Sequence, residues 1–130
     1  MNEIAYLDTS ALVKLVREEN HSAALFSALS AWPRRVTSEL SRVELHRTVR
    51  RVGRGSLRAR ELLSGLTLIE MVESVLDAAE TVGPPQLRLL DAIQLASASS
   101  LGQDLGVFIA YDECLLAAAT AIDLPTLAPA

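Results

Sequence analysis

Apolar and polar residues alternate along this chain in short blocks, and the blocks predict strands and helices in turn. The run Ile4-Ala5-Tyr6-Leu7 is apolar throughout, which is typical of a strand buried on both faces. Asp8-Thr9-Ser10 then offers N-cap side chains for a helix that continues through Val16. Asn20 is placed to cap a second helix, which Pro33 ends. The chain therefore begins as strand, helix and helix.

The same alternation continues to the last residues. Further strands are predicted at 35–37, 66–70, 107–111 and 125–127, and further helices at 38–52, 56–65, 74–81, 87–100 and 112–121. Strands that alternate with helices favour a parallel sheet with right-handed crossovers and helices on both faces. We therefore expect an α/β fold of three layers, α/β/α, with a central, mainly parallel sheet. The length suits a single domain of residues 1–130.

Four carboxylates interrupt this pattern where an acid is costly. Asp8 and Asp112 each follow an apolar strand-like run, Glu44 lies inside a helix, and Asp91 has apolar residues on both sides. An ionised acid beside a buried element costs roughly several kcal/mol unless a cation meets it. Basic residues are scarce beside three of the four, which favours a divalent metal bound by oxygen ligands. In parallel sheets, ligands bind beyond the carboxyl ends of the strands, and two of these acids fall there.

Each acid also has a simpler explanation at this stage. Asp8 and Asp112 are good N-caps for the helices that follow them. Glu44 shares a helical face with two arginines and could form an exposed salt bridge. Asp91 could cap the helix that follows a proline pair. The chemistry depends on whether the four meet in space.

A magnesium-binding receiver domain of signalling proteins is one alternative, because it also places carboxylates at strand ends. Such a domain needs a phosphoacceptor aspartate in mid-chain and a lysine on a late strand. No aspartate lies between Asp8 and Asp77, and the only lysine is Lys14. The sequence therefore disfavours the receiver interpretation.

Composition adds limits on the core and the compartment. Half of the residues are apolar but only 4% are aromatic, so the core must consist of Leu, Ala, Val and Ile. The longest apolar runs are far shorter than a membrane span, and no signal-type segment opens the chain. The single cysteine, Cys114, excludes an internal disulfide, and we expect it to be a small buried group. These features predict a cytoplasmic protein without membrane association.

The charge is unevenly distributed. The net charge is −4 and the pI about 5.1, but nine of the twelve basic residues are arginines between positions 34 and 60. Two glutamates oppose these nine arginines, so the segment carries +7 and the rest of the chain −11. Such polarity is typical of a polyanion-binding face on an acidic body. A solvated surface or a contact with an acidic protein are the alternatives. If the partner is RNA, the candidate backbone contacts are Arg47, Arg50, Arg51 and Arg54.

Four motifs follow one another in the order Asp8-Thr9-Ser10, helical Glu44, Leu90-Asp91-Ala92-Ile93-Gln94-Leu95-Ala96 and Tyr111-Asp112. Together they resemble the PIN-domain nucleases, and within them the VapC-type toxins of bacterial and archaeal toxin–antitoxin pairs. The resemblance implies a PIN-like α/β/α fold and an endoribonuclease that depends on Mg²⁺ or Mn²⁺. It also implies that the four acids are the catalytic metal-site residues and that Ser10 is an auxiliary hydroxyl. Members often carry His where this chain has Gln94, which leaves the role of that side chain open.

The resemblance further implies an RNA substrate, a cognate antitoxin encoded immediately upstream, and a homodimer. The first two helices carry more apolar residues than one sheet face covers: Leu12, Val13, Leu15, Val16, Leu25 and Leu29. We expect part of this set to form a groove for an amphipathic antitoxin tail. An arginine from that tail could enter the acidic cleft and compete with the metal. A catalytically silent PIN-like RNA-binding module is the alternative of another class, and such a module is expected to lack some of the acids.

Overall fold

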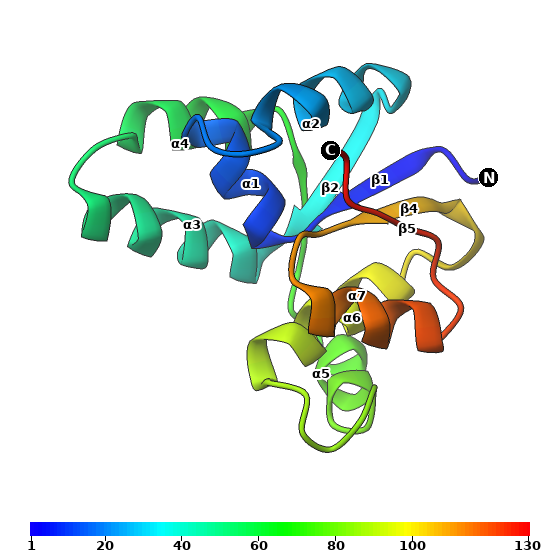
Figure 1. Cartoon of the computed structure of the whole chain (residues 1–130). Coiled ribbons are helices and arrows are strands. Elements are labelled where there is room, and N and C mark those ends of the chain that lie inside the picture. The colour runs from blue at the N-terminus through cyan, green and yellow to red at the C-terminus, as the bar shows by residue number, and fades with distance from the viewer.

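A sheet of five parallel strands forms the centre of the computed structural model, which describes all 130 residues (Figure 1). The strands are β1 (Ile4–Leu7), β2 (Arg34–Ser38), β3 (Thr67–Ile69), β4 (Leu105–Ile109) and β5 (Thr126–Leu127). Their order is β3-β2-β1-β4-β5, and every neighbouring pair is parallel. Receiver domains have the flavodoxin-like order 2-1-3-4-5. The receiver alternative is therefore wrong.

Helices cover both faces of the sheet. They are α1 (Thr9–Val16), α2 (Ser22–Ala28), α3 (Glu39–Val52), α4 (Ser56–Ser64), α5 (Glu73–Ala79), α6 (Leu89–Ser99) and α7 (Glu113–Ala121). Two short 3₁₀ turns, η1 (Leu29–Ala31) and η2 (Gly102–Asp104), precede β2 and β4. Helices α1 to α4 lie on one side of the sheet, α6 and α7 lie on the other, and α5 packs against α6 (Figure 1). This confirms the three-layer α/β/α prediction.

The central strand β1 is apolar at every position because both of its faces are buried. Ala5 and Leu7 pack in the core under α1 to α4, whereas Ile4 and Tyr6 pack in the core under α6 and α7. The ring of Tyr6 stacks on Phe108 of the neighbouring strand, with 5.4 Å between the centroids. The two cores hold the end of β1 in place, and this positions Asp8.

The cap predicted for the second helix is wrong. His21, not Asn20, is the N-cap residue of α2, and it has a left-handed φ of 71° without a side-chain cap hydrogen bond. The Asn20 carbonyl instead accepts a hydrogen bond of 2.9 Å from Lys14 Nζ. This hydrogen bond ties α1 to the turn that precedes α2.

The prediction that Cys114 is buried is also wrong, because its side chain is exposed. Helix α7 buries Leu115, Ala118 and Ala119, which recur at spacings of three and four residues. Cys114 lies one residue before this stripe and turns away from the core. None of the helices combines the length and the apolar character that crossing a bilayer requires.

Candidate metal and RNA site

The site lies where the strand order reverses, at the carboxyl ends of β1 and β4. Asp8 follows β1, and its backbone N–H donates to the Ile109 carbonyl of β4 at 3.0 Å. Its Oδ2 accepts hydrogen bonds from the backbone N–H of Ser10 at 3.2 Å and from Ser10 Oγ at 2.8 Å. Ser10 Oγ in turn accepts from the backbone N–H of Tyr111 at 3.0 Å. Ser10 therefore links the two strand ends and orients Asp8.

The Asp8 carboxylate is buried and has no cationic partner. Only 6% of the residue is exposed, and no ion pair reaches it. Burial raises the pKa of Asp8 to about 6; the Ser10 hydrogen bonds oppose this rise and the nearby Glu44 carboxylate adds to it. Asp8 is an N-cap, as its simpler explanation requires, but that role uses Oδ2 and leaves Oδ1 without a hydrogen bond. An anionic oxygen without a hydrogen bond, on a residue that is otherwise buried, fits a divalent cation.

Glu44 projects from the inner side of α3 toward the same place. Its Oε1 accepts hydrogen bonds from Thr9 Oγ1 at 2.7 Å and from Gln94 Nε2 at 3.0 Å. Its Oε2 accepts none, and no arginine forms an ion pair with it. The salt bridge considered for Glu44 is therefore not formed.

Gln94 is fully buried on α6 and donates a hydrogen bond to Glu44. Its Nε2 also lies 3.2 Å from Thr9 Oγ1 and 3.0 Å from Ser41 Oγ, and its Oε1 accepts from the Tyr6 hydroxyl. The Glu44 carboxylate can only accept hydrogen bonds, and the Tyr6 hydroxyl donates one here. The Gln94 amide therefore has one orientation that satisfies both, with Nε2 toward Glu44 and Oε1 toward Tyr6. Gln94 thus fixes the direction of Glu44, which gives this side chain a structural role.

Asp91 and Asp112 form a second pair, joined by Arg88. Asp91 lies in the first turn of α6 with 12% of its side chain exposed, and its Oδ2 accepts from Arg88 Nε at 3.0 Å. Asp112 is the N-cap of α7; its Oδ1 accepts from the Leu115 N–H and its Oδ2 lies 3.6 Å from Arg88 Nη2. Asp91 is not the cap of its helix, because Arg88 occupies that position. The hydrogen bond and charge of Asp91, and then the charge of Asp112, raise the pKa of the Arg88 guanidinium.

The four acids thus gather at one edge of the sheet as two pairs. The Glu44 carboxylate is close enough to Asp8 to raise the pKa of Asp8, and Arg88 bridges the other two. No three acidic, histidine or cysteine side chains converge closely enough to hold one ion in this arrangement. A single four-carboxylate metal centre therefore stays a prediction.

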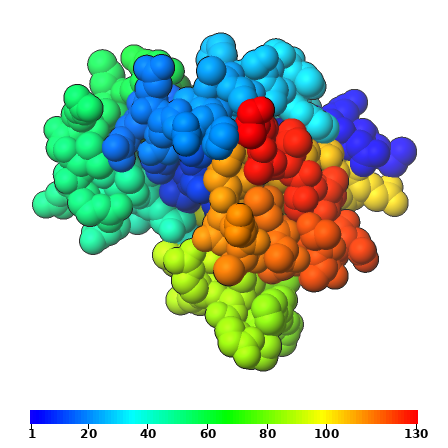
Figure 2. All heavy atoms as spheres, in the orientation of Figure 1, coloured from blue at the N-terminus to red at the C-terminus, as the bar shows by residue number.

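The arginine-rich helix extends from this edge. Arg47, Arg50, Arg51 and Arg54 are exposed and form no ion pair. A hollow of about 430 Å³ connects Arg51 with the carboxylate side, with Ser10 and Asp112 in its wall. Figure 2 shows the surface indented where the cyan-green segment of α3 meets the orange and yellow-green segments.

One arginine of the same stretch has a structural role. Arg35 Nε donates to the Trp32 carbonyl at 2.8 Å and its Nη2 to the Leu29 carbonyl at 2.8 Å. This side chain fixes the turn before β2 and is therefore not available to a polyanion.

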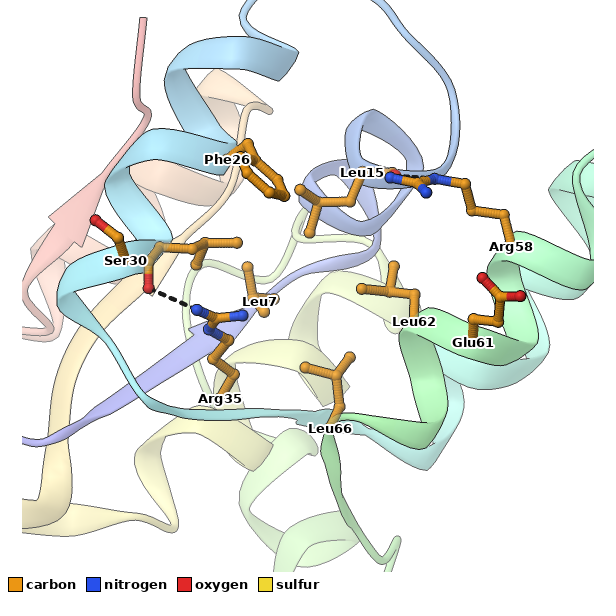
Figure 3. Close-up of a pocket in the computed structure, with 10 residues that line it drawn as sticks. Leu7, Leu15, Phe26, Ser30, Arg35, Arg58, Glu61, Leu62 and Leu66 are labelled. Carbon is orange, nitrogen blue, oxygen red and sulfur yellow. Dashed lines mark hydrogen bonds between the residues drawn. The ribbon is translucent and has the colours of Figure 1, made fainter.

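The apolar residues of the first two helices divide between core and surface. Leu12 and Leu25 are fully buried, so they are not the part of the set that forms a groove. They face inward because they belong to the stripe that α1 and α2 pack on the sheet. Leu15 instead lines an apolar cavity of about 350 Å³ between α1, α2 and α4, together with Phe26 and Leu62 (Figure 3).

Sequence reasoning missed the roles of Thr9, Gln94 and Arg88. Arg88 and Gln94 each lie three residues from Asp91, a spacing that puts side chains on one helical face. Thr9 directly follows Asp8. The spacing around the acids was therefore a usable signal for the residues that hold them.

Comparisons by sequence identify the family and named relatives. A model of the PIN domain family matches residues 5–121. The protein "Ribonuclease VapC47" of Mycobacterium tuberculosis is 42% identical over 130 residues, which cover 95% of this chain and 96% of that protein. "Ribonuclease VapC46" of the same species is 41% identical over 125 residues, which cover 95% of this chain and 96% of that protein.

Comparisons of structure agree as well, and at these identities they concern the fold alone. The Mycobacterium tuberculosis toxin VapC20, described as cleaving the sarcin–ricin loop, superposes with a TM-score of 0.72 at 16% identity. That match covers 96% of this chain and 99% of the toxin. A chain of a toxin–antitoxin complex from Klebsiella pneumoniae gives a TM-score of 0.65 at 23% identity, covering 83% of this chain and 86% of that chain.

Proposed function

This chain belongs to the PIN-domain family, and on that premise we propose that it is the endoribonuclease toxin of a toxin–antitoxin pair. Relatives named as ribonucleases share about two fifths of its residues along nearly its whole length, which supports this reading. The observation that carries the proposal is the buried Asp8 carboxylate, which has no cationic partner at the reversal of strand order. A cytoplasmic location and a homodimer stay predictions of the same proposal.

We propose that Asp8, Glu44, Asp91 and Asp112 hold a divalent ion, Mg²⁺ or Mn²⁺. Carboxylate oxygens are the ligands that such hard cations prefer, and Asp8 and Glu44 each keep one oxygen without a hydrogen bond. When bound, the ion lowers the pKa of water and offsets charge that develops on the phosphate.

The chain's own residues prepare the site for this chemistry. A hydrogen bond from Ser10 orients the Asp8 carboxylate, and hydrogen bonds from Thr9 and Gln94 orient the Glu44 carboxylate. Burial of these contacts keeps water from loosening them, so the two carboxylates need little reorganisation to accept a cation. A catalytically silent RNA-binding module would need at least one of these acids to be missing or disabled, and all four are present.

The exposed arginines of α3, together with Arg54 in the turn after it, are proposed to bind the RNA backbone. Arg47, Arg50, Arg51 and Arg54 leave their guanidinium groups unpaired, so they can bind phosphate without first breaking an ion pair. The hollow lined by Arg51 and Asp112 offers the RNA strand a path from this helix to the acids. Because the arginines lie on a surface apart from the acids, a protein with a net negative charge can still bind a polyanion.

The apolar cavity supports an antitoxin as partner. It lies between α1, α2 and α4, where Arg58 and Glu61 stand beside apolar side chains (Figure 3). Phe26 at its edge is 70% exposed, which is a large apolar area for a ring in water. We propose that the apolar face of an amphipathic antitoxin segment packs on Phe26 and Leu15.

Metal binding and cleavage together test the proposed activity. Protein freed of any partner should bind Mn²⁺ in calorimetry and cut a structured RNA with Mg²⁺ or Mn²⁺, and EDTA should stop the cleavage. Asp8→Asn should abolish the Mn²⁺ signal, and Asp112→Asn should slow cleavage on the order of 100-fold because a ligand of the cation that offsets charge on the phosphate is lost. Asp77→Asn, at an exposed position of α5, is the matched control and should change neither. Cleavage that survives EDTA would contradict the mechanism.

A further inference from the structure

Arg88 is the only basic residue in ion-pair contact with any of the four acids. Its Nε lies 3.0 Å from Asp91 Oδ2, and its Nη2 lies 3.6 Å from Asp112 Oδ2. It lies outside the arginine-rich segment of residues 34–60, at the start of α6. The acidic edge therefore contains one cation of its own.

The backbone at Arg88 is fixed while its side chain is free to move. Its carbonyl accepts the first hydrogen bond of α6, from the Ala92 N–H at 2.9 Å. Its side chain is 73% exposed and contacts no other acid. A long guanidinium side chain on such an anchor can reach several positions around the site.

The fold gains little from a cation at this exposed position, which speaks against a purely structural role. Arg88 caps the N-terminus of α6, where the helix dipole disfavours positive charge. Exposed ion pairs contribute little to folding, so the contacts with Asp91 and Asp112 stabilise the fold only modestly. An arginine at this position is better explained by a ligand that it meets.

We propose that Arg88 is an RNA-phosphate ligand that Asp91 and Asp112 hold until a divalent cation binds them. The proposal rests on the metal site proposed above. Arg88 and the cation compete for the same Oδ2 atoms, so binding of the cation releases the guanidinium. The planar guanidinium fork that binds carboxylates also binds phosphate oxygens. The released group then meets the RNA backbone beside the acids.

The exchange gives metal binding and RNA binding opposite responses to one substitution. In Arg88→Gln the competitor for Asp91 and Asp112 is absent, so Mn²⁺ affinity in calorimetry should rise roughly two- to fivefold, the range of exposed ion pairs. The same variant loses a phosphate contact. The slope of log KM for RNA cleavage against log salt should therefore fall by about 0.7. Arg88→Lys keeps the charge without the fork, so its Mn²⁺ affinity should lie between those of the other two proteins.

Arg34→Gln is the matched control, because Arg34 is also exposed and paired with one acid, Glu3, at 3.7 Å. It lies at the amino end of β2, away from the site, and should leave both quantities unchanged. If Arg88→Gln binds Mn²⁺ no more tightly than the wild type, or keeps its salt slope, the exchange is refuted while the metal site stands. If the wild type binds no Mn²⁺, the metal site and the exchange both fail.

Discussion

A single buried carboxylate, Asp8, carries most of the electrostatic cost of this molecule. Its neighbours Thr9 and Ser10 donate hydrogen bonds near it, but no cation offsets its charge. Proteins usually avoid this arrangement unless a ligand uses it. The cost should therefore be measurable in the protein without metal.

The measurable consequence is a loss of stability with rising pH. The pKa of Asp8 is raised from 3.8 to about 6, so the folded protein binds this proton more tightly than the unfolded chain does. The contribution to the free energy of unfolding is present below pH 4 and is lost as pH rises through 6, by about 3 kcal/mol at most. In EDTA, Asp8→Asn should be more stable than the wild type at pH 7.5, and the difference should shrink toward pH 4. Urea denaturation at both pH values measures it; a constant difference would contradict the raised pKa.

The acids could be predicted from sequence because each stands against an apolar background. Their partners could not, because a hydrogen bond such as that from Gln94 to Glu44 depends on the packing of α6 against α3. Arg88 was missed for the same reason: its spacing to Asp91 was visible, but Asp112 becomes its second partner only when β4 lies beside β1. Leu12 belongs to the apolar set from which a groove was expected, but apolar spacing alone does not say which residues of a stripe reach the core.

At the scale of elements, α3 separates two chemistries by its helical period. Its inner face carries Ser41, Leu45 and Val49, all buried, and Glu44 stands at the edge of this face. The arginines point outward, where they cannot neutralise Glu44. One helix thereby supplies an acid to the site and cations to the surface.

This separation predicts that RNA affinity and metal affinity can be changed independently. Replacing Arg50, Arg51 and Arg54 together by Gln should reduce the slope of log RNA affinity against log salt by roughly 2, since each phosphate contact adds about 0.7. The Mn²⁺ affinity should stay that of the wild type. Arg34→Gln with Arg60→Gln removes exposed arginines elsewhere and serves as the control. An unchanged slope in the triple variant would assign the arginine face to a protein partner.

Element order was predicted well and element ends less well. Every strand and helix occurs where the pattern of apolar residues placed it, because burial on the sheet imposes that pattern. Strand β4, however, ends at Ile109, so Ala110 and Tyr111 lead from the strand to Asp112. The end depends on pairing with β1 and β5, which sequence periodicity does not encode.

At the scale of the whole molecule, the apolar cavity and the acidic edge are neighbours. Leu7 lines the cavity, and the next residue, Asp8, belongs to the site. We expect a partner segment that fills the cavity to continue over the surface of α1 toward the carboxylates. This proximity is a physical basis for inhibition by a bound antitoxin, since an arginine following that segment can pair with the acids.

Phe26 tests this arrangement without disturbing the fold or the chemistry, because its ring is mostly in solvent and lies at the cavity edge (Figure 3). The product of the upstream gene, co-expressed with the wild type, should form a complex that does not cleave RNA. Phe26→Asp should weaken that complex by roughly 30-fold or more, as loss of an aromatic hot-spot residue does, and leave cleavage by the free protein unchanged. Phe26→Leu, which keeps an apolar side chain, should restore most of the affinity. Equal affinity of the wild type and Phe26→Asp in titration calorimetry would place the antitoxin on another surface.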